Sequence, residues 1–285
     1  MTTRLFSRSR CGCAHAKRRA AFTYVELLVV LVLILLAIAF LLPTRRTDGD
    51  SANRVKCASN LRQIGQAILL YSNDNRGVYP RTRASVPDAA GPSPVWGTGV
   101  AATQPFKEDG PAENDITAAL FLLLRTQDIT SEVFTCPCTD QEKDTYGGGT
   151  NAPINRSNFT DWKKNLSYSY QNPYPGTNAI GAGFKLNNAI GAEFAVAADM
   201  NPGTAGRGDN VLAPTSTSSA KDMKQANTRN HDRDGQNILY GDGHVAWESN
   251  PFVGVNRDNI YSTADNKIVA SPVDANDSIL LPADD

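Results

Sequence analysis

One apolar run near the N-terminus constrains this chain more than any other feature of its sequence. Residues Leu27–Leu42 are sixteen consecutive apolar residues, and Glu26 is the only charged residue between Phe22 and Leu42. Counted from Phe22, the run has 21 residues, close to the ~20 that a helix needs to cross the hydrocarbon core of a bilayer. We therefore expect residues 22–43 to form a transmembrane helix.

The segment before this run is strongly basic. Residues 1–21 contain six of the 28 Lys and Arg residues and no acid. Because positively charged flanks stay in the cytoplasm, we expect a single-pass protein of the inner (cytoplasmic) membrane, with a cytoplasmic N-terminus and a periplasmic head. A secretory signal peptide is the alternative. The run is long for one, however, and it ends in Pro43-Thr44-Arg45-Arg46 without a small-residue cleavage site.

The remainder of the chain is acidic. When the six basic residues of segment 1–21 are set aside, residues 22–285 carry 22 basic and 29 acidic side chains. Nucleic-acid binding depends on clustered basic side chains. This excess of acids argues against a nucleic-acid partner.

Glu26 is the most informative residue of the apolar region. A carboxylate near the start of a membrane helix is costly, so it needs a partner. A cut before Phe22 would create an α-amino group four residues from Glu26. The amine of one subunit could then neutralise the carboxylate of its neighbour in a stacked assembly.

Residues Ala21–Val30 closely resemble the class III leader of type IV pilins and type II secretion pseudopilins. The resemblance implies that a prepilin peptidase cuts between Ala21 and Phe22 and methylates the new amine. It also gives Pro43 the place of the helix-kinking proline that the family often carries. The family normally has Gly before the cut, where this chain has Ala21. The implied partners are prepilin peptidase, other pilin or pseudopilin subunits and an inner-membrane assembly platform.

A second helix and a head domain follow the apolar run. Apolar residues recur at steps of three and four from Val55 to Tyr71, which predicts an amphipathic stalk helix within residues 44–76. Residues 77–285 contain candidate strands at 132–136, 166–170, 193–197, 237–240 and 244–247 and a candidate helix at 116–124. We expect an α+β fold, in which a long N-terminal membrane and stalk helix packs on a small antiparallel β-sheet head.

Two histidines lie close together in residues 230–248. The simplest interpretation is two strands joined by a Gly-Asp-Gly hairpin, in which glycine supplies positive φ. The alternative is a metal or catalytic site, in which His231 and His244 meet the carboxylate of Asp242. No nucleophile–base pair can be placed beside them, so we expect no catalytic residue and no enzymatic activity.

The same segment resembles the "H-X9-DG" prepilin-processing-associated domain of pseudopilin-like families. The matching residues are His231, Asp242, Gly243 and His244, together with the segments 57–65 and 198–203. Ten residues, rather than nine, separate His231 from Asp242. A turn over residues 232–235 would absorb the extra residue without moving the strand side chains to the other face. The resemblance implies no chemistry for these residues.

Metal and disulfide sites are also suggested. By resemblance to the major pseudopilin, whose head often holds calcium, Asn256 and Asp258 are candidate calcium ligands; a solvated turn is the alternative. Otherwise we expect no cofactor. A disulfide from Cys57 to Cys136 or Cys138 would join the stalk helix to the head, with three buried or reduced thiols as the alternative. Cys136-Pro137-Cys138 resembles half of a zinc knuckle, but no second pair follows, so zinc is not expected.

These features favour a structural protein. We expect a prepilin or pseudopilin subunit of a type II secretion or type IV pilus-like fibre, processed and N-methylated by prepilin peptidase. The alternative is a membrane-tethered ligand- or metal-binding head that borrows only the leader.

Overall fold

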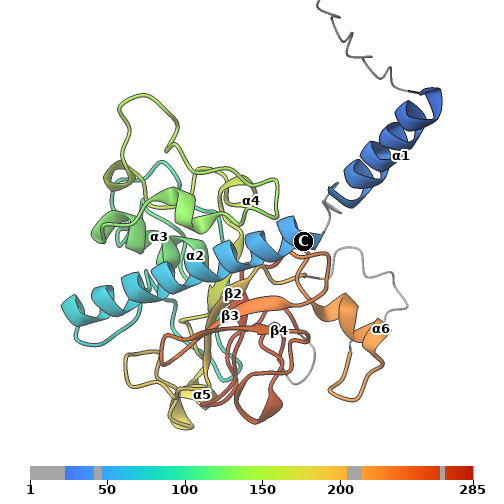
Figure 1. Cartoon of the computed structure of the whole chain (residues 1–285). Helices are drawn as coiled ribbons and strands as arrows, with labels where there is room; N and C mark the ends of the chain where they lie inside the picture. Colours follow the sequence, from blue (N-terminus) through green and yellow to red (C-terminus); the bar gives the residue numbers. More distant parts are fainter. Residues whose placement is uncertain (1–22, 42–46, 204–213, 264–266, 285) are drawn as a thin grey trace, which may run out of the picture. The chain divides into compact units, whose positions relative to one another are not determined.

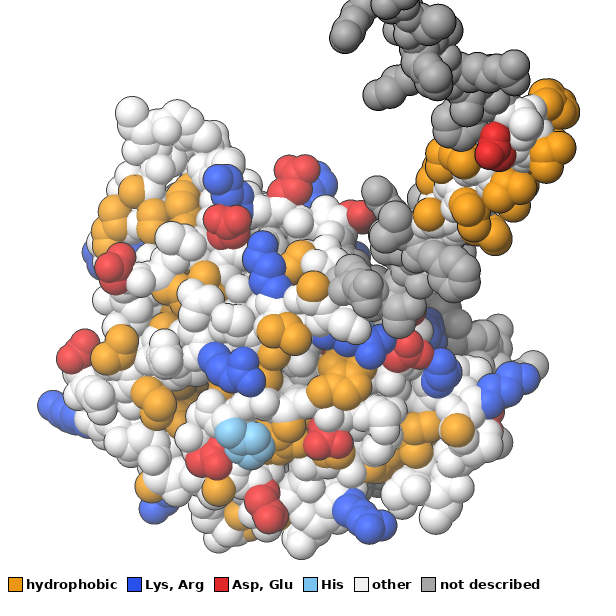
Figure 2. All heavy atoms as spheres, in the orientation of Figure 1, with side chains coloured by type: hydrophobic (Ala, Val, Ile, Leu, Met, Phe, Trp, Pro, Cys, Tyr) orange, Lys and Arg blue, Asp and Glu red, His pale blue; other side chains and the backbone are white. Residues whose placement is uncertain are grey.

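The computed structural model describes residues 23–41, 47–203, 214–263 and 267–284. The chain divides into two units, residues 1–46 and 47–285. The described part of the first unit is one helix, α1 (Tyr24–Leu41). A capping box begins it: Thr23 N donates to Glu26 Oε2 at 2.9 Å, and Glu26 N donates to Thr23 Oγ1 at 3.3 Å. Figure 2 shows apolar side chains covering the visible face of α1.

The predicted fold class is wrong in its N-terminal part. No helix among the described residues is long and apolar enough to cross a membrane. Helix α1 has 18 residues, about 27 Å at ~1.5 Å per residue, against ~30 Å of hydrocarbon core. Nor is one long helix present, because α1 ends at Leu41 and the next helix begins at Thr47. The predicted transmembrane helix over residues 22–43, the membrane description and the inner-membrane location are therefore wrong.

The second unit combines helices with an antiparallel sheet. Its α-helices are α2 (Thr47–Asp74), α3 (Ile116–Thr126), α4 (Trp162–Asn165), α5 (Thr177–Gly181) and α6 (Ala220–Met223). Short 3-10 helices are η1 (Ser131–Phe134), η2 (Pro153–Asn155), η3 (Lys224–Ala226) and η4 (Val255–Arg257). The strands are β1 (Tyr168–Gln171), β2 (Ala195–Asp199), β3 (Gln236–Tyr240), β4 (Val245–Glu248) and β5 (Leu280–Leu281).

The five strands form one sheet in the order β4-β3-β2-β1-β5. Every neighbouring pair is antiparallel, and β3 pairs with β4 through the register Asn237↔Trp247. Strands β1, β2 and β3 are buried along their whole length. Polar residues at their ends are therefore held in the interior of the unit.

Helix α2 lies across the sheet and contacts β2, β3 and β4 (Figure 1). Its buried stripe starts at Cys57 and includes Leu61, Ile64 and Ile68, whereas Val55 is 66% exposed. Gly65 permits a close approach to β3, since a Cβ atom there would lie 2.8 Å from Leu239 Cδ1. The close packing brings the side chain of Cys57 into the interior.

Candidate functional site

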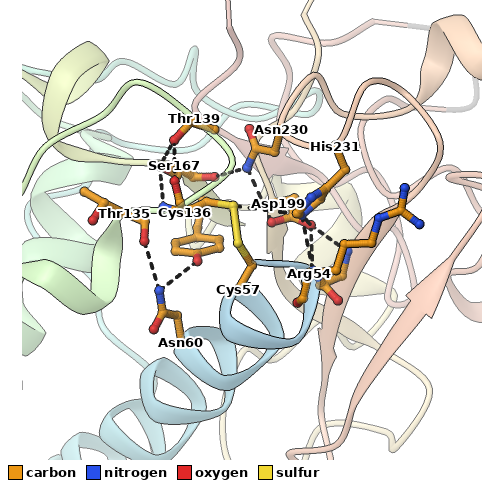
Figure 3. Close-up of a disulfide and its surroundings, with 12 residues drawn as sticks. Arg54, Cys57, Asn60, Thr135, Cys136, Thr139, Ser167, Asp199, Asn230 and His231 are labelled. Carbon is orange, nitrogen blue, oxygen red and sulfur yellow. Dashed lines mark hydrogen bonds and ion pairs between the residues drawn. A yellow bond between two sulfur atoms is a disulfide. The ribbon is translucent and has the colours of Figure 1, made fainter. Parts of the chain in front are cut away.

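A disulfide joins α2 to the loop after η1. Cys57 and Cys136 are bonded, with an S–S distance of 2.15 Å, a Cα–Cα distance of 5.3 Å and a sequence separation of 79 (Figure 3). Both residues are buried. This bond connects α2, the first helix of the second unit, to the loop after η1, which follows α3 in the sequence.

Hydrogen bonds reinforce the same junction. Asn60, one turn after Cys57, donates from Nδ2 to Thr135 O at 2.9 Å and to the Tyr168 hydroxyl at 3.2 Å. The backbone N–H of Cys136 donates to Ser167 Oγ at 2.9 Å. Burial raises the pKa of Tyr168 well above its ordinary value, so this hydroxyl stays protonated. The disulfide is thus surrounded by uncharged hydrogen-bonding groups on the β1 side.

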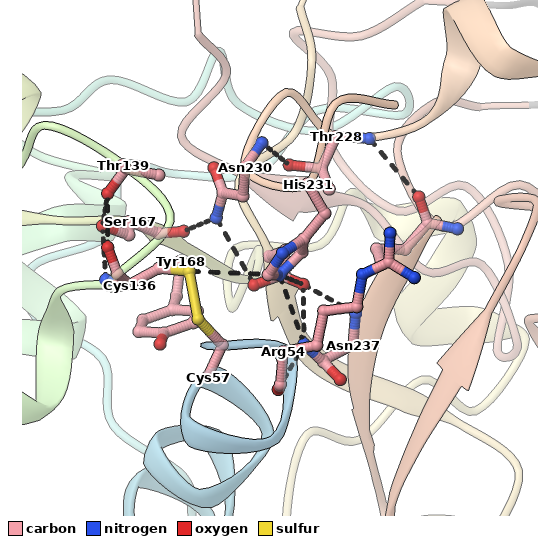
Figure 4. Close-up of polar contacts among 12 residues, drawn as sticks. Arg54, Cys57, Cys136, Thr139, Ser167, Tyr168, Thr228, Asn230, His231 and Asn237 are labelled. Carbon is pink, nitrogen blue, oxygen red and sulfur yellow. Dashed lines mark hydrogen bonds and ion pairs between the residues drawn. A yellow bond between two sulfur atoms is a disulfide. The ribbon is translucent and has the colours of Figure 1, made fainter. Parts of the chain in front are cut away.

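A buried histidine–carboxylate pair lies on the other side of the disulfide. His231 Nε2 is 3.0 Å from Asp199 Oδ2, and both side chains are fully buried. Asp199, the last residue of β2 (labelled in Figure 3), also accepts from the N and Nδ2 atoms of Asn237 (labelled in Figure 4), at 2.6 Å and 3.1 Å. Asn230 Nδ2 donates to the other carboxylate oxygen at 3.4 Å. A buried carboxylate is tolerated because several donors satisfy it.

The imidazole of His231 is positioned by one aromatic contact and by polar contacts at one of its two nitrogens. Its ring meets the Trp247 ring edge to face, with centroids 5.2 Å apart. The Arg54 guanidinium carbon lies 4.3 Å from the Trp247 ring centroid, and Arg54 pairs with Asp234 at 3.1 Å. The second ring nitrogen, Nδ1, is buried without a hydrogen-bond partner among the described residues.

The two halves of the site meet at Cys136. Its Sγ atom is 3.9 Å from His231 Nε2. Cys138, which lies outside the disulfide and is half-buried, adds a third sulfur. One potential ligand atom from each of Cys57, Cys136, Cys138 and His231 lies within 4.8 Å of all the others. The site therefore holds three sulfurs and an imidazole beside a carboxylate.

His244 and Asp242 belong to a different place. They lie exposed at the β3–β4 turn, where His244 Nδ1 is 2.5 Å from Asp242 Oδ1 and the His244 ring stacks on Tyr240. Hydrogen bonds from His244 lower the pKa of Asp242. His231 instead contacts Asn237, near the start of β3. Asn237 is three residues, or roughly 10 Å along the strand, from Tyr240 at the turn. The structure does not bring the two histidines together.

The predicted calcium ligands lie at η4. Asn256 adopts a left-handed conformation with φ 59. Asp258 shares a cavity with Asp274 and Asp277. Burial raises the pKa of Asp258 to about 7 and that of Asp277 to about 6, and neighbouring carboxylates add to both shifts. This group of acids is separate from the sulfur site in the sequence and in its contacts.

Of the predicted processing and assembly residues, only Glu26 is described. Its side chain is exposed, and hydrogen bonds from Thr23 lower its pKa. Ala21, Phe22 and Pro43 lie outside the described residues.

The sequence did not indicate that Asp199, Asn237 and Trp247 contact His231. A signal was nevertheless present, because the segments 57–65 and 198–203 that share the H-X9-DG resemblance contribute Cys57 and Asp199 to the site. No family model, no curated protein and no solved structure matches this chain. The resemblance to pilins therefore depends on sequence motifs alone.

Proposed function

We propose that this chain is a structural subunit of a pilin- or pseudopilin-like fibre, cut before Phe22 and N-methylated by prepilin peptidase. One observation carries the proposal: the large apolar side chains of α1 are exposed in the part of the chain that the structure describes. All thirteen large apolar residues from Tyr24 to Ile38 are between 44% and 79% exposed. A helix that is apolar all round is normally buried.

The free energy available from covering α1 is large. Full burial of one large apolar side chain contributes about 1.5–3 kcal/mol, so half-burial of thirteen contributes on the order of 10 kcal/mol. That is comparable to the ~4–15 kcal/mol lost in association. A single partner would cover only one stripe of the helix. Several identical helices that surround one another cover every side, as in the core of a fibre.

Glu26 supports identical copies as the partners. It is the only charged residue of α1, and it would need a cation once the helix is covered. The amine created at Phe22 of a neighbouring copy supplies one. In the isolated chain, hydrogen bonds from Thr23 N and Oγ1 stabilise the Glu26 carboxylate in place of that amine.

The sulfur site suits a subunit that transmits tension. Helix α2 follows α1 in the sequence, and the Cys57–Cys136 bond ties α2 to the sheet-bearing part of the unit. Asn60 of α2 donates to Thr135 O and to the Tyr168 hydroxyl, and Asn237 of β3 donates to Arg54 O of α2. A pull on the N-terminal helix would therefore be resisted by a covalent bond.

The test compares two substitutions that the capping box distinguishes. Glu26→Ala removes the carboxylate and its two hydrogen bonds from Thr23, whereas Thr23→Ala removes the two hydrogen bonds of the hydroxyl and keeps the carboxylate. We expect both variants to be cut before Phe22. Fibres seen by electron microscopy should be lost or strongly reduced in Glu26→Ala and retained in Thr23→Ala. Normal fibres from Glu26→Ala, or equal loss in both variants, would refute the pairing.

A further inference from the structure

The sulfur site brings four potential metal ligands close together. Cys57 comes from α2, Cys136 and Cys138 from the loop after η1, and His231 from the loop before β3. Their ligand atoms lie within 4.8 Å of one another, and three of the four residues are buried. The ligands thus come from three segments that are far apart in the sequence.

The donor types match those of a structural zinc site. Three thiolates and one imidazole are a common tetrahedral set, with Zn–S distances of ~2.3 Å and Zn–N distances of ~2.0–2.1 Å. Tetrahedral angles then place a sulfur and a nitrogen about 3.5 Å apart across the ion. The observed distance from Cys136 Sγ to His231 Nε2 is 3.9 Å. A shift of a few tenths of an ångström would bring these two atoms to the separation expected for two ligands of one zinc ion.

The surroundings of His231 differ at its two ring nitrogens. Its side chain is fully buried, yet Nδ1 has no partner among the described residues. An unsatisfied buried polar atom costs about 1–3 kcal/mol. Asp199 Oδ2 contacts Nε2, the nitrogen that lies 3.9 Å from Cys136 Sγ, at 3.0 Å, so a cation bound at Nε2 would take the place of this hydrogen bond and the buried carboxylate would balance part of its charge.

We propose that the reduced chain binds one zinc-type divalent cation through Cys57, Cys136, Cys138 and His231. The Cys57–Cys136 disulfide is the oxidised, metal-free state of the same site. A sulfur bonded to another sulfur has no thiolate charge to offer, so the two states exclude each other. Either state fastens α2 to the loop after η1.

The interconversion balances in electrons and protons. A dithiol reductant gives two electrons and two protons to the disulfide, which yields the thiols of Cys57 and Cys136, and the reductant becomes a disulfide. Binding of the cation then releases the thiol protons of Cys57, Cys136 and Cys138 to solvent. A disulfide oxidant reverses the first step and expels the cation.

The test uses the full chain in mild detergent, with Cys11→Ser and Cys13→Ser to remove the two cysteines of segment 1–21. Co²⁺ is added to this parent in its reduced and its oxidised form, and the thiolate-to-cobalt absorption bands are titrated. We expect one Co²⁺ per reduced chain with tetrahedral spectra, displacement by Zn²⁺, and no thiolate-bound Co²⁺ in the oxidised chain. Absence of stoichiometric Co²⁺–thiolate binding in the reduced chain would overturn the proposal.

Two variants assign the ligands. Cys138→Ser leaves the disulfide able to form, so the oxidised variant can be checked for correct folding before it is reduced. His231→Asn has a matched control in His244→Asn, which changes an exposed histidine outside the site. We expect affinity to fall at least tenfold in Cys138→Ser and His231→Asn and to be unchanged in His244→Asn. Parent-like affinity in Cys138→Ser would overturn the assignment even if His231→Asn fails to fold.

Discussion

Loss of the Cys57–Cys136 bond should lower the unfolding free energy of residues 47–285 by about 3 kcal/mol. The bond joins residues 79 apart, and loop-closure entropy for such a loop is worth about 4.5 kcal/mol at 25 °C. Removal of a single disulfide typically costs about 2–4 kcal/mol. In a unit of this size each kcal/mol lowers the melting temperature by about 2–4 °C. The expected fall is therefore roughly 6–12 °C.

The assay is urea unfolding, with thermal melts, of the purified unit. The samples are the parent, Cys57→Ala, Cys136→Ala and the parent reduced by a dithiol, all with a chelator so that no metal substitutes for the bond. The reduced parent separates the loss of the cross-link from the loss of packed side-chain atoms. Cys138→Ala is the control and should change the unfolding free energy by less than ~1 kcal/mol. If the reduced parent unfolds at the same urea concentration as the oxidised parent, the proposed stapling of α2 is refuted.

The remaining predictions concern buried carboxyl groups. Asp199→Asn puts an amide donor opposite the donors of Asn237 and His231, so urea unfolding should show a loss of at least about 2 kcal/mol; a loss near zero would contradict the account of this pair. Because burial raises the pKa of Asp258 to about 7 and that of Asp277 to about 6, both groups favour folding below pH ~4, and this contribution is lost as the pH rises through 6 to 7. Asp258→Asn should therefore be more stable than the parent by about 1–2 kcal/mol at pH 8 and no more stable at pH 4; parallel stability curves would show that Asp258 does not titrate in this way. If calcium binds here, millimolar Ca²⁺ should raise the melting temperature of the parent at pH 8 but not that of Asp258→Asn, and equal shifts would exclude Asp258 as a ligand.

Local sequence patterns predicted local structure well. The apolar stretch 116–124 is present as α3, with Asp115 as the cap whose side chain accepts from Ala118 N. The hairpin expected in segment 230–248 is present as β3 and β4. Gly243 has φ +87 in its turn, the conformation that glycine adopts without strain.

Two local predictions were wrong for physical reasons. Residues 132–136 have strand-forming side chains but begin in η1, where Val133 and Phe134 reach the core from a helical turn rather than from a pleated strand. A short apolar run does not distinguish these two arrangements. The prediction of one long N-terminal helix was wrong because an apolar run followed by an apolar stripe does not indicate where one helix ends and the next begins.

The candidate site depends on contacts between segments far apart in the sequence, which local hydrophobic periodicity does not predict. Cys57 and Cys136 were each named from sequence, but their proximity comes from the packing of α2 across the sheet. Asp199 meets His231 because β2 and β3 are neighbours in the sheet. Zinc was not expected from the sequence because Cys136 and Cys138 have no second cysteine pair near them in the chain. The structure places Cys57 and His231, from distant segments, close to that pair.

N-terminal sequencing with intact mass, on protein taken from its native cell, tests the central claim most directly. The proposed fibre subunit predicts a chain that starts at an N-methylated Phe22. A chain that still starts at Met1 would contradict processing at Ala21 and, with it, the proposed assembly through α1.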